Sequence, residues 1–233
     1  MKLSDDILLN PGETVEDLGE GLRIIQGQEE FKFGTDAVKL SNFTNLHNGD
    51  KVMDLCTGTG IVPILLQKKQ PAVSVVGLEI QEQMAEMAQR SVKLNNLTGK
   101  IEIVQGDLKK VRELFPAESF QVVTCNPPYM KNNTGKQNER ESVTIARHEL
   151  CCNLTDCVEA AAYLLPSGGR FYMVHRPERL ADILSVMRDK NVEPKRLTMF
   201  LGGKSKTPRL LVVEGQKNRN SGLIVEIDTG ETL

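Results

Sequence analysis

An alternation of β-rich apolar runs with helical patterns is the feature that most constrains the fold of this chain. Strand-like runs stand at KVMDL (51–55), VSVVGLE (73–79), IEIVQGD (101–107), FQVVTC (120–125) and RFYMVH (170–175). The main helical patterns lie between them, at IVPILLQKK (61–69), QEQMAEMAQRSVKLNNL (81–97) and LTDCVEAAAYLLPSGG (154–169). Because parallel strands need crossover helices and are apolar along both faces, this order predicts an α/β fold with a mostly parallel sheet and helices on both sides.

The two ends of the chain depart from this alternation. At the carboxyl end three strand-like runs follow one another with no helix between them: RLTMFLG (196–202), RLLVVEG (209–215) and LIVEI (223–227). They predict an antiparallel hairpin at one edge of the sheet. At the amino end we expect a small cap over residues 1–45, with a strand at LRIIQ and a helix at TDAVKLSNF, that contributes to the functional site. Residues 46–233 are expected to form a single compact unit.

The composition restricts the partners of the chain. A length of 233 residues, 39% of them hydrophobic, is enough to bury one full core. The amino terminus, MKLSDDILLN, lacks the apolar core of a signal peptide, and no later segment has the span of a membrane helix, so we expect a cytoplasmic protein with no membrane partner. The formal net charge of -2 means that any nucleic acid must be contacted through a local basic patch.

The five cysteines are Cys56, Cys125, Cys151, Cys152 and Cys157. Their number is odd and their spacing contains no CxxC pair. The spacing therefore indicates neither a disulfide framework nor a zinc site, and we expect reduced, packed thiols and no metal.

A glycine-rich turn, DLCTGTGIVP (54–63), stands where the first core strand passes into the first core helix. Gly58 and Gly60 allow a tight turn and the close approach of a ligand to unpaired N–H groups at the start of the helix. Glu79 ends the next strand, where an acidic side chain can accept both hydroxyls of a ribose. The turn alone is also compatible with a purely structural role, but together with Glu79 it predicts a site for a nucleoside-containing cofactor.

The residues around the glycines favour S-adenosylmethionine over a dinucleotide. Pro63 stands where the third glycine of a pyrophosphate-binding turn is required, and the Asp54 carboxylate would repel a diphosphate. A cofactor with a sulfonium and an amino group suits that acidic edge. Asp107, after the third strand, can accept from an adenine amino group, although a helix-capping role is equally compatible with its position.

The series DLCTGTG, Glu79, QGD and NPPY resembles the class I S-adenosylmethionine-dependent methyltransferases that methylate amino nitrogens. The usual first motif of that class is D/E-x-G-x-G-x-G, and Cys56 stands here in place of its first glycine. The resemblance implies a Rossmann-like fold with a mostly parallel seven-stranded sheet. Upstream, FKFGTDAVKL (31–40) resembles the segment that flanks the methionine end of the cofactor in one order of these enzymes, although Thr35 is also a candidate helix cap. The cofactor contacts implied are Gly34, Thr35, Asp36, Asp54, Thr57, Gly58, Gly60, Glu79, Ile80, Asp107, Leu108 and Asn126.

In that class the fourth strand ends in the motif that here reads Asn126, Pro127, Pro128 and Tyr129, which the resemblance makes the catalytic residues. An adenine or amide nitrogen is a poor nucleophile because its lone pair is delocalised, so it must be held in line with the methyl group. The amide oxygen of Asn126 and the main-chain carbonyl of Pro127 can accept its two N–H groups, while the prolines stiffen the backbone. Tyr129 offers a face on which an unstacked base can lie. A rigid loop with a core tyrosine is the structural alternative.

The absence of a large extra domain bears on the substrate. The combination of FKFGTDAVKL, DLCTGTGIVPILL, CNPPYMKN and ARHEL (146–150) resembles the bacterial tRNA(Val) adenine N6-methyltransferase family, which implies a tRNA substrate methylated at the adenine beside the anticodon. Glutamine methylation of a protein, or a non-catalytic cofactor-sensing RNA-binding role, remains an alternative. We assign Arg147, His148 and Glu149 a structural role, and the oligomeric state stays open between a monomer and a weak dimer. Candidate phosphate contacts, each also compatible with a solvated loop, are Lys131, Lys136, Arg140, Arg147, Lys204, Lys206 and Arg209.

Overall fold

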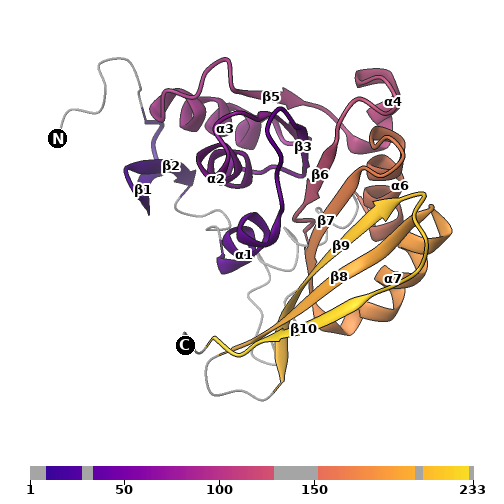
Figure 1. Cartoon of the computed structure of the whole chain (residues 1–233). Helices are drawn as coiled ribbons and strands as arrows, with labels where there is room; N and C mark the ends of the chain where they lie inside the picture. The colour runs from indigo at the N-terminus through magenta and orange to yellow at the C-terminus, as the bar shows by residue number, and fades with distance from the viewer. Residues whose placement is uncertain (1–8, 28–33, 129–151, 203–206, 231–233) are drawn as a thin grey trace.

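Eight strands of the described residues form one sheet at the centre of the molecule. The computed structural model describes residues 9–27, 34–128, 152–202 and 207–230. The strands follow the order β10-β8-β9-β7-β6-β3-β4-β5 across the sheet (Figure 1). They are β3 (Lys51–Leu55), β4 (Ser74–Glu79), β5 (Ile101–Gln105), β6 (Val122–Cys125), β7 (Arg170–His175), β8 (Val192–Leu201), β9 (Pro208–Lys217) and β10 (Ile224–Asp228). Strands β3 to β7 are mutually parallel, and the chain order reverses between β3 and β6.

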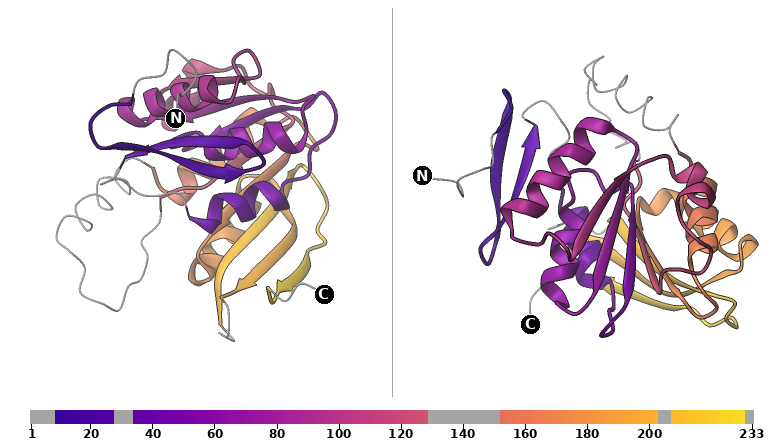
Figure 2. Two further views of the ribbon diagram at one scale, coloured as in Figure 1. Left: turned by 90° about the vertical axis from the view of Figure 1, so that its left-hand side faces the viewer. Right: turned by 90° about the horizontal axis from the view of Figure 1, so that it is seen from above.

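Helices cover both faces of this sheet, as the alternation predicts (Figure 2). One face carries α1 (Thr35–Phe43), α2 (Ile61–Lys69) and α3 (Glu82–Leu94). The other carries α4 (Val111–Leu114), α6 (Leu154–Leu164) and α7 (Leu180–Asp189). Two short 3-10 turns, η1 (Leu108–Lys110) and η2 (Pro177–Arg179), precede α4 and α7.

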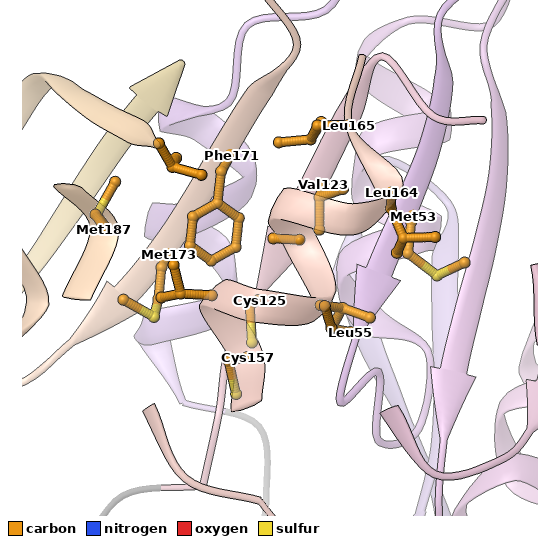
Figure 3. Packing of buried hydrophobic residues seen from close by; sticks show 14 of the residues in the cluster. Met53, Leu55, Val123, Cys125, Cys157, Leu164, Leu165, Phe171, Met173 and Met187 are labelled. Atoms are coloured by element: carbon orange, nitrogen blue, oxygen red, sulfur yellow. The ribbon is translucent and has the colours of Figure 1, made fainter. Parts of the chain in front are cut away.

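The central strand β7 is buried on both faces because each face packs against a helix layer. In β7, Phe171 and Met173 lie in the core on the α6 and α7 side (Figure 3). Tyr172 and Val174 lie in the core on the α1 and α2 side. All four side chains have 0% exposure. Successive residues of a strand point to opposite faces, so one run of apolar residues supplies two cores.

The predicted carboxyl-terminal hairpin is confirmed, since β9 pairs antiparallel with both β7 and β8. The predicted count of seven strands is wrong, because β10 adds an eighth. It lies parallel to β8 at the sheet edge, and Thr198 Oγ1 donates to Glu226 Oε2 at 3.1 Å across the pair. The outer position leaves Ile224 and Ile227 63% exposed.

The amino-terminal strand and helix are confirmed, but the strand has a partner that the sequence did not reveal. β1 (Glu13–Gly19) pairs with β2 (Leu22–Gly27) in a separate two-stranded sheet. The hairpin lies on α3, where Ser91 Oγ accepts from Ile25 N at 3.0 Å and Asn95 Oδ1 accepts from Arg23 N at 2.8 Å (Figure 2). The division of the chain at residue 45 stays a prediction. None of the helices in the described ranges combines the length and apolarity needed to cross a bilayer.

Candidate cofactor site and active site

The predicted site residues that follow β3, β4, β5 and β6 lie at one edge of the sheet, because these four parallel strands end side by side. Leu55 is paired with Leu78 of β4 and with Cys125 of β6, and Glu79 is paired with Gln105 of β5. The segments that follow these strands therefore emerge at one edge of the sheet. The point where the strand order reverses, between β3 and β6, is where open α/β sheets form a ligand crevice.

The turn after β3 uses three residues with positive φ. Cys56, Gly58 and Gly60 have φ of 58°, 56° and 88°. A Cβ on Gly60 would lie 3.2 Å from the Cβ of Ala88, so this glycine lets α2 approach α3. A Cβ on Gly58 would meet nothing within 4 Å, so the space beside this residue is open. Gly60 therefore serves packing, whereas Gly58 borders open space, and a ligand contact by Gly58 stays a prediction.

Asp54 faces into the protein and joins the turn to the neighbouring strand. Its side chain is buried, with Oδ2 accepting from Thr57 Oγ1 and Oδ1 accepting from Thr124 Oγ1, both at 2.6 Å. Burial raises the pKa of Asp54 to about 7, although the two threonine hydrogen bonds oppose the rise. Both oxygens are thus used to hold the turn against β6, and a direct cofactor contact by Asp54 stays a prediction.

Glu79 contacts the glycine turn directly. Its Oε2 accepts from Gly58 N at 2.8 Å, and its Oε1 accepts from Gln81 N at 3.0 Å. The structure thereby brings together two features that lie 21 residues apart in the sequence. A carboxylate has about four acceptor positions, so Glu79 retains the capacity to accept ribose hydroxyls. The next residue, Ile80, is 37% exposed and offers an apolar surface beside them.

Asp107 acts as a helix cap, which was the alternative to cofactor binding. Its Oδ1 accepts from Lys109 N at 2.9 Å at the start of η1, and Lys109 Nζ lies 3.9 Å from its Oδ2. Leu108 is buried among the apolar residues on the α6 side of the sheet. A contact of Asp107 or Leu108 with adenine stays a prediction.

The residues after β6 stand next to the glycine turn. Thr124, two residues before Asn126, is the side chain that bonds to Asp54. Asn126 and Pro128 are partly exposed, and Pro127 is buried between them. Tyr129 lies outside the described residues.

The segment at the start of α1 differs in one respect from expectation. Gly34 occupies the N-cap position and Thr35 is the first helical residue, so Thr35 is not the cap. Thr35 is exposed, and its Oγ1 lies 3.5 Å from Asp36 Oδ1. The helix packs against α2, whose amino end carries the glycine turn. A cofactor contact by these three residues stays a prediction.

One of the candidate phosphate contacts is described. Arg209 is exposed on β9, and its carbonyl oxygen accepts from Arg176 Nη1 at 2.8 Å, which places a second arginine beside it that the sequence did not single out. The other candidates lie outside the described residues, namely Lys131, Lys136, Arg140, Arg147, Lys204 and Lys206, as do His148 and Glu149.

Four of the five cysteines meet beneath the glycine turn, which their sequence spacing did not indicate. Cys56 Sγ lies 3.8 Å from Cys152 Sγ, and Cys157 Sγ lies 4.0 Å from Cys152 Sγ. The sulfurs of Cys56, Cys125 and Cys157 all lie within 4.8 Å of one another. We call Cys56, Cys125, Cys152 and Cys157 the thiol cluster. The pKa of Cys56 is raised to about 11: hydrogen bonds with Cys125 and Cys152 lower it, and the bond with Cys157 together with burial raises it.

Comparison with characterised sequences gives one family and a consistent set of relatives. The family model for the methyltransferase small domain matches residues 27–190. A tRNA1(Val) (adenine(37)-N6)-methyltransferase from Flavobacterium psychrophilum is 25% identical over 208 residues, which cover 87% of this chain and 88% of the relative. The protein of the same name from Bacteroides thetaiotaomicron is 27% identical over 197 residues, which cover 84% and 80%.

Solved structures of methyltransferases share the fold. A predicted O-methyltransferase from Agrobacterium tumefaciens superposes with a TM-score of 0.66 at 20% identity, covering 82% of this chain and 85% of its own. A SAM-dependent O-methyltransferase from Thermotoga maritima superposes with a TM-score of 0.59 at 12% identity, covering 82% and 68%. Because the family model spans the glycine turn, Glu79 and the Asn126 segment, the chain belongs to the methyltransferase small domain family.

Proposed function

We propose that this chain is an S-adenosylmethionine-dependent methyltransferase that methylates the exocyclic N6 amine of an adenine in tRNA, with adenine 37 of tRNA(Val) as the target. The main support from the structure is the position of Asn126 and Pro127. They follow β6 directly beside the glycine turn, in which Gly58 N donates a hydrogen bond to Glu79. The curated relatives named tRNA1(Val) (adenine(37)-N6)-methyltransferase support the choice of base and RNA.

The edge of the sheet fits the cofactor. Glu79 would hold the ribose hydroxyls, the open backbone at Gly58 would lie against the ligand, and Ile80 would cover one face of the adenine. S-adenosylmethionine, when bound, supplies an electrophilic methyl group. Gly34, Thr35 and Asp36 are proposed to contact its methionine end, and Asp107 its adenine amino group.

The residues after β6 would orient the acceptor amine. The side-chain oxygen of Asn126 and the main-chain carbonyl of Pro127 would each accept one N–H of the amine, which favours a tetrahedral nitrogen with an available lone pair. Pro127 and Pro128 lack N–H donors and have fixed φ, so they hold these acceptors in place. Tyr129 is proposed to stack on the target base. No strong general base is needed, because the amine proton becomes acidic as the new bond forms.

A methyl-transfer assay tests the proposal and its closest competitor. The purified chain is incubated with a labelled methyl donor and three acceptors: an unmodified tRNA(Val) transcript, the same transcript with guanosine at position 37, and a protein with an accessible glutamine. We expect label only in the first transcript. Label in the protein alone would replace this proposal with glutamine methylation, and cofactor and tRNA binding without transfer would leave a non-catalytic RNA-binding protein. A tRNA substrate would place the chain in the cytoplasm.

A further inference from the structure

The thiol cluster gathers side chains from three separate segments of the chain. Cys56 begins the glycine turn after β3, Cys125 ends β6, and Cys152 and Cys157 lie just before and inside α6. Three of the four are buried and Cys56 is partly exposed. Figure 3 shows the side chains of Cys125 and Cys157 next to each other at the lower margin of the core.

The sulfurs lie close enough together to be drawn onto one tetrahedral ion. Zinc–sulfur bonds of about 2.3 Å in a tetrahedron place neighbouring sulfurs about 3.8 Å apart. The sulfur of Cys152 lies 3.8 Å from that of Cys56 and 4.0 Å from that of Cys157, and the sulfurs of Cys56, Cys125 and Cys157 lie within 4.8 Å of one another. Cys152 does not belong to that group of three, so its sulfur is farther from Cys125 and zinc binding would draw these two sulfurs together. An iron–sulfur cluster would have to fit its own sulfides between the thiols, and distances this short leave no such space.

We propose that Cys56, Cys125, Cys152 and Cys157 together bind one Zn²⁺ ion as a closed, structural site. Each thiol loses its proton on binding, so four protons are released and the four thiolates with Zn²⁺ carry a charge of -2. The amino terminus of α6, which lies between Cys152 and Cys157, places the positive end of its dipole beside this charge. With four thiolate ligands the ion has no open position for water, so the site braces the fold and performs no chemistry.

The backbone of Cys56 supports this assignment independently. Its φ of 58° lies in the left-handed region, where glycine is favoured, and glycine is the usual residue at this place in the motif. A cysteine there carries a conformational cost and contributes a sulfur directed at the other three thiols. The ion would connect the glycine turn to the residue immediately before Asn126 and to α6, so it would hold both halves of the proposed active site in register.

Metal analysis of the full chain tests the site. The chain is purified under reducing conditions without chelator or affinity tag, and metals are measured by inductively coupled plasma mass spectrometry. We expect about one zinc ion per chain. In the chain stripped of metal, added Co²⁺ should give the d–d absorption and thiolate charge-transfer bands of a tetrahedral all-sulfur site, and Zn²⁺ should abolish them.

Two ligand variants and one control distinguish metal binding from core packing. Cys157→Ser should lose at least about nine-tenths of the zinc, because a hydroxyl is a poor replacement for a thiolate ligand. Cys56→Gly should lose it too while keeping the fold, since glycine suits the φ at this position. Val158→Ala removes methyl groups from the same buried face of α6 but no sulfur, and it should keep the full zinc content.

Three results would overturn the proposal. One is a reduced, folded chain that takes up less than about a tenth of an equivalent of zinc or cobalt when the metal is added in excess. Another is iron with acid-labile sulfide. The third is a metal-free chain whose mass is lower by two hydrogen atoms for each pair of cysteines, which would make the cluster a disulfide site. None of these depends on methyl transfer, so a failed zinc site and a failed tRNA methyltransferase assignment give different data.

Discussion

The turn after β3 and the turn after β6 lie at the same edge of the sheet but differ in their residues: the first is built on glycines and the second on prolines. After β3, the turn contains Gly58 and Gly60 at positive φ, which side chains disfavour, and Gly58 has open space beside it. After β6, Pro127 and Pro128 restrict the backbone to extended conformations and remove two donors. Under the proposed function, glycine in the first turn lets the backbone lie against the cofactor, and proline in the second holds a carbonyl oxygen in one direction toward the acceptor amine.

The two turns nevertheless share one buried carboxylate. Asp54 accepts from Thr57 in the first turn and from Thr124 in the strand that leads to the second, both at 2.6 Å. Any movement of one turn relative to the other must break one of these hydrogen bonds inside the protein, where an unpaired group is costly. We therefore expect the two turns to have separate functions, and the position of each turn relative to the other to depend on Asp54.

The largest effect is expected at the proline-containing turn. Asn126→Ala removes the side-chain acceptor for the amine, and we expect turnover to fall on the order of 10²- to 10³-fold, as for loss of other preorganised polar groups in active sites. Cofactor affinity should change much less, because Asn126 is one of several implied cofactor contacts and the glycine turn is untouched. Single-turnover methyl transfer and calorimetric cofactor binding measure the two quantities. An equal loss of turnover and of cofactor affinity would show that acceptor binding and cofactor binding are not separated between the two turns.

Asp54→Ala tests the shared carboxylate. The hydroxyls of Thr57 and Thr124 would lose their acceptor in the core, and we expect the free energy of unfolding to fall by about 2–4 kcal/mol. Asp54→Asn is the matched control, because its oxygen can still accept from one threonine, and Thr124 Oγ1 also lies 3.5 Å from Met53 O. Urea unfolding of both variants gives the values, and a loss as large for asparagine as for alanine would contradict the hydrogen-bond account.

The same carboxylate predicts a dependence of stability on pH. Burial raises the pKa of Asp54 in the folded chain to about 7 from an ordinary value of 3.8, so the folded state holds a proton that the unfolded state has released between these values. The contribution of Asp54 to stability is therefore fully present below pH 3.8 and is lost as the pH rises to about 7. The wild type should lose about 1.4 kcal/mol per pH unit in this window relative to Asp54→Asn. Urea unfolding of both proteins at several pH values measures this difference. If their stabilities do not diverge, the pKa of Asp54 in the folded chain is not raised to about 7.

Features of the fold and the site that depend on local residue patterns could be predicted from the sequence. Features that depend on contacts between distant parts of the chain could not. The parallel sheet, the hairpin and the turn containing Gly58 follow from periodicity and residue type. The position of β10 depends on a choice among sheet edges, which its five residues do not encode. The thiol cluster depends on the pairing of β3 with β6 and on the packing of α6 against β6, which bring together cysteines far apart in the chain, so no sequence spacing could indicate it.

The smallest effect separates the two glycines within the first turn. Gly60→Ala should lower the free energy of unfolding by about 1–3 kcal/mol, because the new Cβ is both at positive φ and pressed against Ala88. Gly58→Ala carries the conformational cost alone, about 1–2 kcal/mol, because nothing lies within 4 Å of the new Cβ. That Cβ would instead fill the space proposed for the cofactor, so Gly58→Ala should weaken cofactor binding more than its smaller effect on stability suggests. Thermal unfolding and cofactor titration of the pair decide the matter: if Gly58→Ala binds the cofactor as tightly as the wild type, the ligand does not lie against this turn, and the open space beside Gly58 faces only solvent.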